Sequence, residues 1–267
     1  MNGEFLFYLA ASFCSGAIFV SAATIAAERL GSLVGGIIAG FPNTVVIALL
    51  FIGIVNGVDA VVPAAMMVPM IVGFSGLFML VYALWRNSPH HVLNAMAALL
   101  TWLVLSTLTF FYAPKTIVFS ISVLVICFLI GFGVFRFHLK IPRSEGKKIP
   151  LTWSITVVRG VVGGSIICLA VLLARLSGPV LGGIATGFPA IMLSTMLIAG
   201  YSNGLQFARS LAEPMFFGGV VNSSAYVIAT YFFYPLFGLV LGTIFSLLVA
   251  LVTALISYQL AKYIIRS

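Results

Sequence analysis

Residues 33–57 and residues 180–204 of this chain are two copies of one apolar segment. Their sequences, LVGGIIAGFPNTVVIALLFIGIVNG and VLGGIATGFPAIMLSTMLIAGYSNG, align without a gap at an offset of 147 residues. Ten of the 25 aligned positions are identical, including Gly-Phe-Pro at residues 40–42 and 187–189. Each copy carries its proline near the middle of a stretch that is apolar enough to cross a membrane. Internal repeats whose helices are interrupted at matching positions indicate the binding site of a transporter fold.

The low content of charged residues excludes a soluble globular domain. The 267 residues are 62% hydrophobic and only 7% charged, with a mean hydropathy of +1.24, whereas soluble domains contain about 25% charged residues. The chain is therefore expected to be an integral membrane protein, with the lipid bilayer as its main partner. Its N-terminus lacks the basic segment of a cleaved signal peptide, and residues 5–27 are long enough to span a bilayer.

The breaks between the apolar runs predict nine membrane-spanning helices. These breaks consist of Asn, Gly, Pro and charged residues, which favour turns and helix ends. We expect an all-α polytopic membrane protein with a first repeat (1–112), a linking helix followed by a basic loop (113–150), and a second repeat (151–267). The predicted helices cover residues 5–27, 32–55, 60–85, 92–112, 116–137, 152–174, 179–202, 207–232 and 236–262.

Lys and Arg residues are divided unequally between the two sides of these helices. If the N-terminus is outside, ten of them lie on one side, only Lys115 and Arg175 lie on the other, and Arg159 lies within a span. Cytoplasmic loops carry an excess of Lys and Arg, so we expect the N-terminus outside and the C-terminus in the cytoplasm, in the inner (plasma) membrane. The linking helix turns the second copy over, which predicts an inverted 4+1+4 repeat.

Two prolines are expected at mid-depth in the membrane. Pro42 lies about ten residues into its helix, or roughly 15 Å at 1.5 Å per residue, near the middle of a ~30 Å hydrocarbon core, and Pro189 lies at the same depth. A proline inside a helix removes a hydrogen bond and kinks or breaks the helix, while the preceding glycines permit close approach or unwinding. Two interpretations are open: a ligand site built from exposed half-helix ends, or a tight crossing of two helices.

The segment IAGFPNTVVIALLFIGIVNGVDAV resembles the GlpM-like group of small bacterial inner-membrane proteins. The resemblance lies in the Ala-Gly before Phe-Pro, the aliphatic run, a glycine sixteen residues after Phe41, and the step Val58-Asp59-Ala60. It covers about 30 residues of each copy. This chain departs from the group by its internal duplication, and by Asn43 and Ala190 at the position where the group tends to carry Thr. The resemblance implies a membrane fold and brings no settled biochemical activity with it.

Arg159 is the most informative single charge. It lies about seven residues into its predicted helix, roughly 10 Å deep at 1.5 Å per residue, and a charge at such depth is by default a functional-site hypothesis. Its guanidinium could bind a carboxylate or phosphate through two hydrogen bonds. Alternatively, the side chain could reach back to the cytoplasmic interface. None of the five acidic residues is clearly mid-membrane, so the sequence gives proton-coupled antiport little support.

The expected substrate-binding residues surround the two Gly-Phe-Pro motifs. Ser194 and Asn222 are polar positions in neighbouring stretches of the predicted spans, where they could instead hydrogen-bond adjacent helices. The full set is Gly40, Phe41, Pro42, Asn43, Gly187, Phe188, Pro189, Arg159, Ser194 and Asn222.

The leading functional hypothesis is a secondary transporter or exporter of a small solute, with anions as one candidate class. The sequence contains no HExxH, GxSxG or Walker motif, so we expect no enzyme, no metal site and no cofactor. The basic residues of 138–150 fit anionic lipid better than nucleic acid. The alternative is a non-transporting accessory or scaffold protein, whose Gly-rich faces bind a second copy in a homodimer or another membrane protein.

Overall fold

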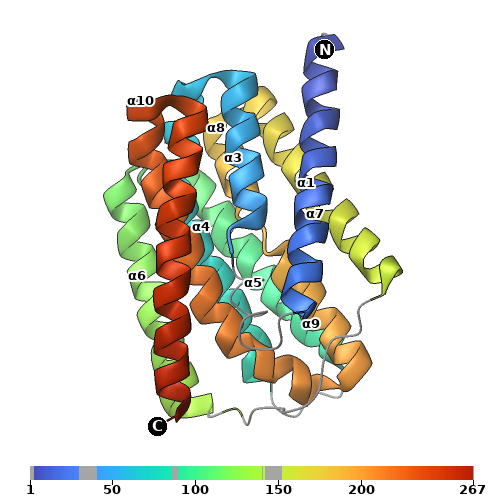
Figure 1. The fold of residues 1–267 in the computed structure, drawn as a ribbon. Helices are drawn as coiled ribbons and strands as arrows, with labels where there is room; N and C mark the ends of the chain where they lie inside the picture. The colour runs from blue at the N-terminus through green and yellow to red at the C-terminus, as the bar shows by residue number, and fades with distance from the viewer. Residues whose placement is uncertain (1–2, 30–40, 86–89, 140, 142–151, 267) are drawn as a thin grey trace.

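The computed structural model describes residues 3–29, 41–85, 90–139, 141 and 152–266, which form one helical bundle (Figure 1). The first half contains α1 (Gly3–Arg29), α3 (Asn43–Asn56), α4 (Val58–Leu84) and α5 (His91–Tyr112). The linking segment contains α6 (Ile117–Gly133) and a π-helical extension, η1 (Val134–Leu139). The second half contains α7 (Trp153–Ser177), α8 (Pro179–Thr186), α9 (Ala190–Asn203) and α10 (Leu205–Arg266).

Seven helices in the described part of the chain are long and apolar enough to cross a membrane. The sequence predicts nine, and the difference arises at two places. One is α3, whose 14 residues follow a segment, 30–40, that lies outside the described residues. The other is α10, which contains the non-helical residue Gly238 (φ 71°, ψ −175°) and is counted as a single element. The structure is that of an all-α, multi-pass membrane protein, and the count of nine stays a prediction.

The turn within α10 lies three residues beyond the predicted break at Tyr234-Pro235. Pro235 is inside the helix, a position that membrane helices tolerate because neighbouring groups satisfy the backbone. The reversal occurs at Gly238, because its positive φ is accessible to glycine and costly for other residues. After the turn the two arms pack together, with Tyr234 Oη and Thr243 Oγ1 2.6 Å apart.

Equivalent helices of the two copies pack against each other. α1 packs extensively on α7, and α4 on α10, and in both pairs the partners correspond at the 147-residue offset. The contacts are reciprocal: a side chain added at Gly16 would meet Ile167, and one added at the equivalent Gly163 would meet Val20, which is equivalent to Ile167. Such reciprocity is typical of two copies related by an approximate two-fold axis.

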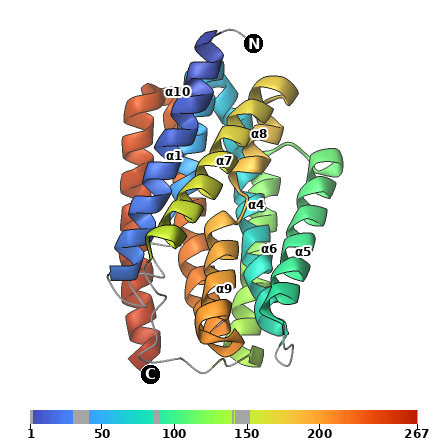
Figure 2. The same cartoon turned by 90° about the vertical axis from the view of Figure 1, so that its right-hand side faces the viewer.

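The two copies also run in opposite directions. In Figure 1, α3 begins at mid-height and extends upward, toward the end of the bundle where the chain starts. Figure 2 shows α8 in the upper half and α9 in the lower half, with the chain break between them at mid-height. The N-terminal ends of α3 and α9 therefore both lie near the middle of the bundle and point their helices toward opposite ends.

The distribution of apolar side chains separates central from peripheral helices. α4 is the most buried helix among the described spans, while α5, α6 and the second arm of α10 carry rows of exposed large apolar residues. Val118 and Leu100, for example, are 72% and 62% exposed. An exposed apolar surface of this extent marks contact with a membrane, so these helices form the lipid-facing side and α4 the interior.

Candidate functional site

The second Gly-Phe-Pro motif breaks its helix completely. α8 ends at Thr186, α9 begins at Ala190, and residues 187–189 between them are not helical. The end of α8 is closed by two backbone hydrogen bonds, from Gly187 N to Ile184 O and from Phe188 N to Ala185 O, each 3.2 Å. Pro189 has no N–H to continue the ladder, and the first bond of α9 runs from Leu193 N to Pro189 O at 2.8 Å.

The described part of the first motif has the same geometry. Pro42 precedes α3 with φ −71° and ψ 48°, and Pro189 precedes α9 with φ −79° and ψ 50°. The first helical bond of α3 runs from Val46 N to Pro42 O at 2.9 Å, at the position equivalent to the first bond of α9. Gly40 lies outside the described residues. The duplicated sequence thus places a helix start at the same position in both copies.

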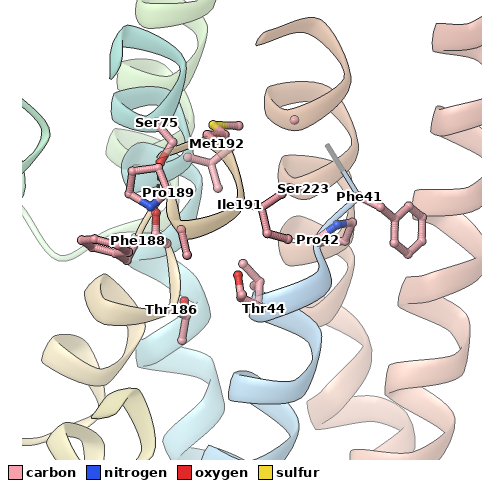
Figure 3. A pocket seen from close by; sticks show the side chains of 15 residues that line it. Phe41, Pro42, Thr44, Ser75, Thr186, Phe188, Pro189, Ile191, Met192 and Ser223 are labelled. Atoms are coloured by element: carbon pink, nitrogen blue, oxygen red, sulfur yellow. Dashed lines mark hydrogen bonds between the residues drawn. The ribbon is translucent and has the colours of Figure 1, made fainter. Parts of the chain in front are cut away.

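Both helix starts line one cavity. Its space open to the centres of water molecules is about 50 Å³, which is room for about four waters. Figure 3 shows Pro42 and Pro189 on opposite sides, with Thr44, Thr186 and Ser223 between them. The lining residues come from five helices (α3, α4, α8, α9 and α10) and the two breaks: Phe41, Pro42, Thr44, Val45, Val72, Ser75, Thr186, Gly187, Phe188, Pro189, Ala190, Ile191, Met192, Gly219 and Ser223.

The backbone at the two helix starts gives the cavity an electropositive character. The first N–H groups of a helix have no partner within it, and the prolines before α3 and α9 supply no side-chain cap. Thr44 and Val45 in α3, and Ile191 and Met192 in α9, occupy these positions and line the cavity. A helix N-terminus carries roughly half a positive elementary charge, so the two starts face the cavity with the same sign.

Four hydroxyl side chains add hydrogen-bonding groups to the cavity wall. Ser75 Oγ lies 2.9 Å from Gly187 O and 3.2 Å from Ile71 O, so it ties α4 to the second break. Thr186 Oγ1 donates to Gly183 O at 2.7 Å. Thr44 and Ser223 complete the set. No charged side chain of the described residues lines the cavity, and these residues contain no cluster of three or more metal-ligating His, Cys, Asp or Glu side chains.

Five of the ten residues expected from the sequence line this cavity: Phe41, Pro42, Gly187, Phe188 and Pro189. The ring of Phe188 also packs edge-on against Trp102 of α5, with 5.3 Å between the ring centroids. The two motifs, which are 147 residues apart in the sequence, therefore both line one small cavity. The second motif also packs against α5 through Phe188.

The other expected residues lie elsewhere. Asn43 begins α3 and is buried. Ser194 donates to Ile191 O at 3.1 Å within α9, and Asn222 Oδ1 accepts from Ser257 Oγ at 3.5 Å between the two arms of α10. Arg159 is buried on α7 with 5% of its surface exposed. None of these four side chains lines the cavity.

Ten of the fifteen lining residues were not in the expected set, among them Thr44, Val72, Ser75 and Thr186. The repeat relates two of them to other lining residues, since Val72 corresponds to Gly219 and Thr44 to Ile191 at the 147-residue offset. Thr44 follows Pro42 by two residues and falls in the first turn of the restarted helix. Ser75 gave no signal, because it lies in a continuously apolar helix whose contact with the second break is a tertiary contact.

One family model matches this chain twice, and its description is "Protein of unknown function (DUF3147)". The matches cover residues 9–115 and 156–263. The chain belongs to this family. The matches begin 147 residues apart, the offset of the repeat, and they confirm the internal duplication. No curated protein and no solved structure matches the chain. The resemblance to the GlpM-like group and the predicted domain boundaries stay predictions.

Proposed function

We propose that this chain is a secondary transporter or exporter of a small solute, and that the solute binds in the cavity between the two Gly-Phe-Pro breaks. The observation that carries the proposal is the convergence of the starts of α3 and α9 on one cavity. Broken helices in corresponding positions of two repeats are how transporters build a site at the membrane midplane. A pair of helices that only crossed tightly would have no need for two exposed helix starts at the crossing.

The proposed architecture is an inverted 4+1+4 repeat of nine membrane-spanning helices. The reciprocal contacts of Gly16 and Gly163 and the opposite directions of α3 and α9 support it. Gly238 would separate the eighth helix from the ninth, and α6 would be the linking span. The excess of Lys and Arg on one predicted side supports an N-terminus outside and a C-terminus in the cytoplasm of the inner (plasma) membrane.

The alternative, an accessory or scaffold protein, needs Gly-rich faces that are available to a partner. In the described second copy these faces pack inside the chain. A side chain added at Gly182 would meet Ala174 of α7 at 2.5 Å, and one added at Gly183 would meet the backbone of Ala64 in α4. Gly187 likewise packs on Ile71. This internal use of the glycines favours the transporter proposal over the scaffold.

Access to the cavity from both sides of the membrane tests the proposal. Cys14, Cys127 and Cys168 are first replaced by alanine, and Ser223→Cys is then introduced at the cavity wall. A membrane-impermeant thiol reagent reaches Ser223→Cys from a given side only if the cavity communicates with that side of the membrane. For a transporter, we expect labelling of right-side-out vesicles and also of inside-out vesicles.

Ser224→Cys is the matched control, because Ser224 is one residue further along α10, is 5% exposed and does not line the cavity. We expect it to stay unlabelled from either side under the same conditions. Labelling of Ser223→Cys from one side only, or from neither, would contradict alternating access and leave the scaffold as the better description.

A further inference from the structure

Most of the carbonyl oxygens around the second break already accept a hydrogen bond, in contrast to the N–H groups at the helix starts. Transporters bind cations through the carbonyl oxygens of unwound segments and anions through helix N-termini. Whether the carbonyl oxygens are already hydrogen-bonded therefore helps to distinguish a cation site from an anion site. Four consecutive or near-consecutive acceptors are satisfied within the protein: Gly183 O by Thr186 Oγ1, Ile184 O by Gly187 N, Ala185 O by Phe188 N, and Gly187 O by Ser75 Oγ. These four carbonyls are therefore poor ligands for a cation.

The donors at the helix starts are arranged differently. The N–H groups of Thr44 and Val45 precede the first helical hydrogen bond of α3, those of Ile191 and Met192 precede the first of α9, and no proline side chain caps them. All four residues line the cavity. Backbone N–H groups at a helix start, combined with the helix dipole, favour an anion.

The hydroxyl of Thr44 is a second and independent indication of a ligand. The side chain is 8% exposed and lines the cavity, and Figure 3 shows its oxygen on the side that faces Thr186. No hydrogen-bond partner is found for it among the described residues. The hydroxyl is therefore available to donate a hydrogen bond to an acceptor bound in the cavity. The equivalent residue in the second copy is Ile191, so this donor exists on one side only.

Charge and volume restrict the anion further. Each helix start contributes roughly half a positive elementary charge, while the end of α8 at Thr186 contributes a partial negative charge of similar size. The backbone field at the cavity is therefore positive but weak, and no charged side chain of the described residues lines the cavity to balance more than one negative charge. The space of about 50 Å³ is far below the 300–1,000 Å³ that is usual for pockets that hold organic ligands. A site of this size suits a small inorganic anion better than an amino acid, a sugar or a nucleotide.

We infer that the cavity binds one small monovalent inorganic anion, of the size of a halide or nitrate, through the backbone N–H groups at the starts of α3 and α9 and the hydroxyl of Thr44. The inference rests on the proposed function, since it names the solute class of the same site. Thr44 is the residue that distinguishes the two halves of the site and is the natural target for a test.

The test is thermal unfolding of the purified full chain in sodium gluconate, which supplies a bulky organic anion, during titration with sodium fluoride, chloride or nitrate. A ligand that binds the native state raises the unfolding temperature in a saturable manner, which gives a Kd. We expect at least one of these anions to stabilise the wild type, and exchange of sodium for potassium or choline to have no effect. Stabilisation by a cation, or by none of the three anions, would overturn the inference.

Thr44→Val removes the hydroxyl at nearly constant volume, and we expect the Kd of the stabilising anion to rise about tenfold or more, which is the value of a hydrogen bond to a charged group. Thr195→Val is the matched control, because Thr195 is equally buried on α9 and does not line the cavity. Its Kd should stay within about twofold of wild type. If Thr44→Val does not fold, the anion Kd of Thr44→Ser, which keeps the hydroxyl, is compared with that of Thr44→Ala, which lacks it. An unchanged Kd in the hydroxyl-free variant would overturn the assignment to this cavity.

Flux measurements separate this inference from the proposed function. Proteoliposomes loaded with the stabilising anion release it into gluconate medium if the protein is a transporter, and an ion-selective electrode records the release. Anion binding without flux would support the site and contradict transport. Flux of a neutral or cationic solute without anion stabilisation would support transport and overturn the anion.

Discussion

Replacing Gly183 by alanine tests whether the close contact between α8 and α4 holds the second break in place. An added Cβ would meet the Cα and carbonyl carbon of Ala64 at 2.8 Å, and it would meet the Ala64 carbonyl oxygen at a still shorter distance. Ordinary contact begins at 3.4 Å, so the two backbones must separate by about half an ångström or more, and no flexible side chain can absorb the change. Overpacking of this kind costs about 1–3 kcal/mol.

That loss is measurable as a lower unfolding temperature. One kcal/mol corresponds to about 2–4 °C for a chain of this size class. We therefore predict that the unfolding temperature of Gly183→Ala in detergent, measured by intrinsic tryptophan fluorescence, is lower by roughly 2–12 °C. Gly133→Ala is the matched control, because Gly133 ends α6 and an added Cβ there meets nothing within 4 Å. It should leave stability unchanged or raise it by up to about 1 kcal/mol.

The comparison can refute the reasoning directly. If Gly183→Ala and Gly133→Ala unfold at the same temperature, the contact of α8 with α4 is not as tight as the structure has it. The position of Gly187, Phe188 and Pro189 against α4 would then be in doubt as well, because the same pair of helices fixes them. A loss confined to Gly183→Ala would support both the packing and the cavity beside it.

Two further predictions concern the duplicated turns and the buried arginine. Gly57 and Gly204 occupy a backbone region open almost only to glycine (φ 87° and 86°, ψ 162° and 167°). Gly57→Ala and Gly204→Ala should therefore each lower the free energy of unfolding by about 1–3 kcal/mol, and the two losses should add in the double variant. Unequal losses measured by thermal unfolding would contradict the equivalence of the copies. Arg159→Lys keeps the charge and removes the guanidinium. Because Arg159 does not line the cavity, the Kd of the stabilising anion should stay within about threefold of wild type. A tenfold rise in this Kd would indicate that the guanidinium contacts the anion.

The elements that sequence reasoning located are those specified by local chemistry. The duplicated Gly-Phe-Pro predicted interrupted helices, and α8 ends and α9 begins around residues 187–189. The prediction was accurate there because a proline cannot donate to the ladder wherever it is placed. At Pro235 the same reasoning failed, since the helix continues through the proline and turns at Gly238. A proline favours a break, but the tertiary arrangement decides whether the chain reverses there.

The parts of the site that could not be predicted depend on which helices meet. Ser75 contacts the second break only because α4 passes beside it, 112 residues earlier in the sequence. Arg159 was predicted as a site residue because its charge lies deep in a predicted span. The depth of a residue along a helix does not specify the direction in which its side chain points from the helix axis. The composition of the wall therefore follows from helix packing, which a single sequence encodes only indirectly.

The two copies share a backbone arrangement at the cavity while their side chains there differ. Pro42 and Pro189 have nearly the same dihedral angles, but Thr44 stands opposite Ile191, and Ser75 corresponds to Asn222, which does not line the cavity. Recognition through backbone N–H groups requires only that the helix begins at this point, so it survives such divergence. A fused duplicate is also free to place different side chains on the two sides of the site, which two identical subunits cannot do.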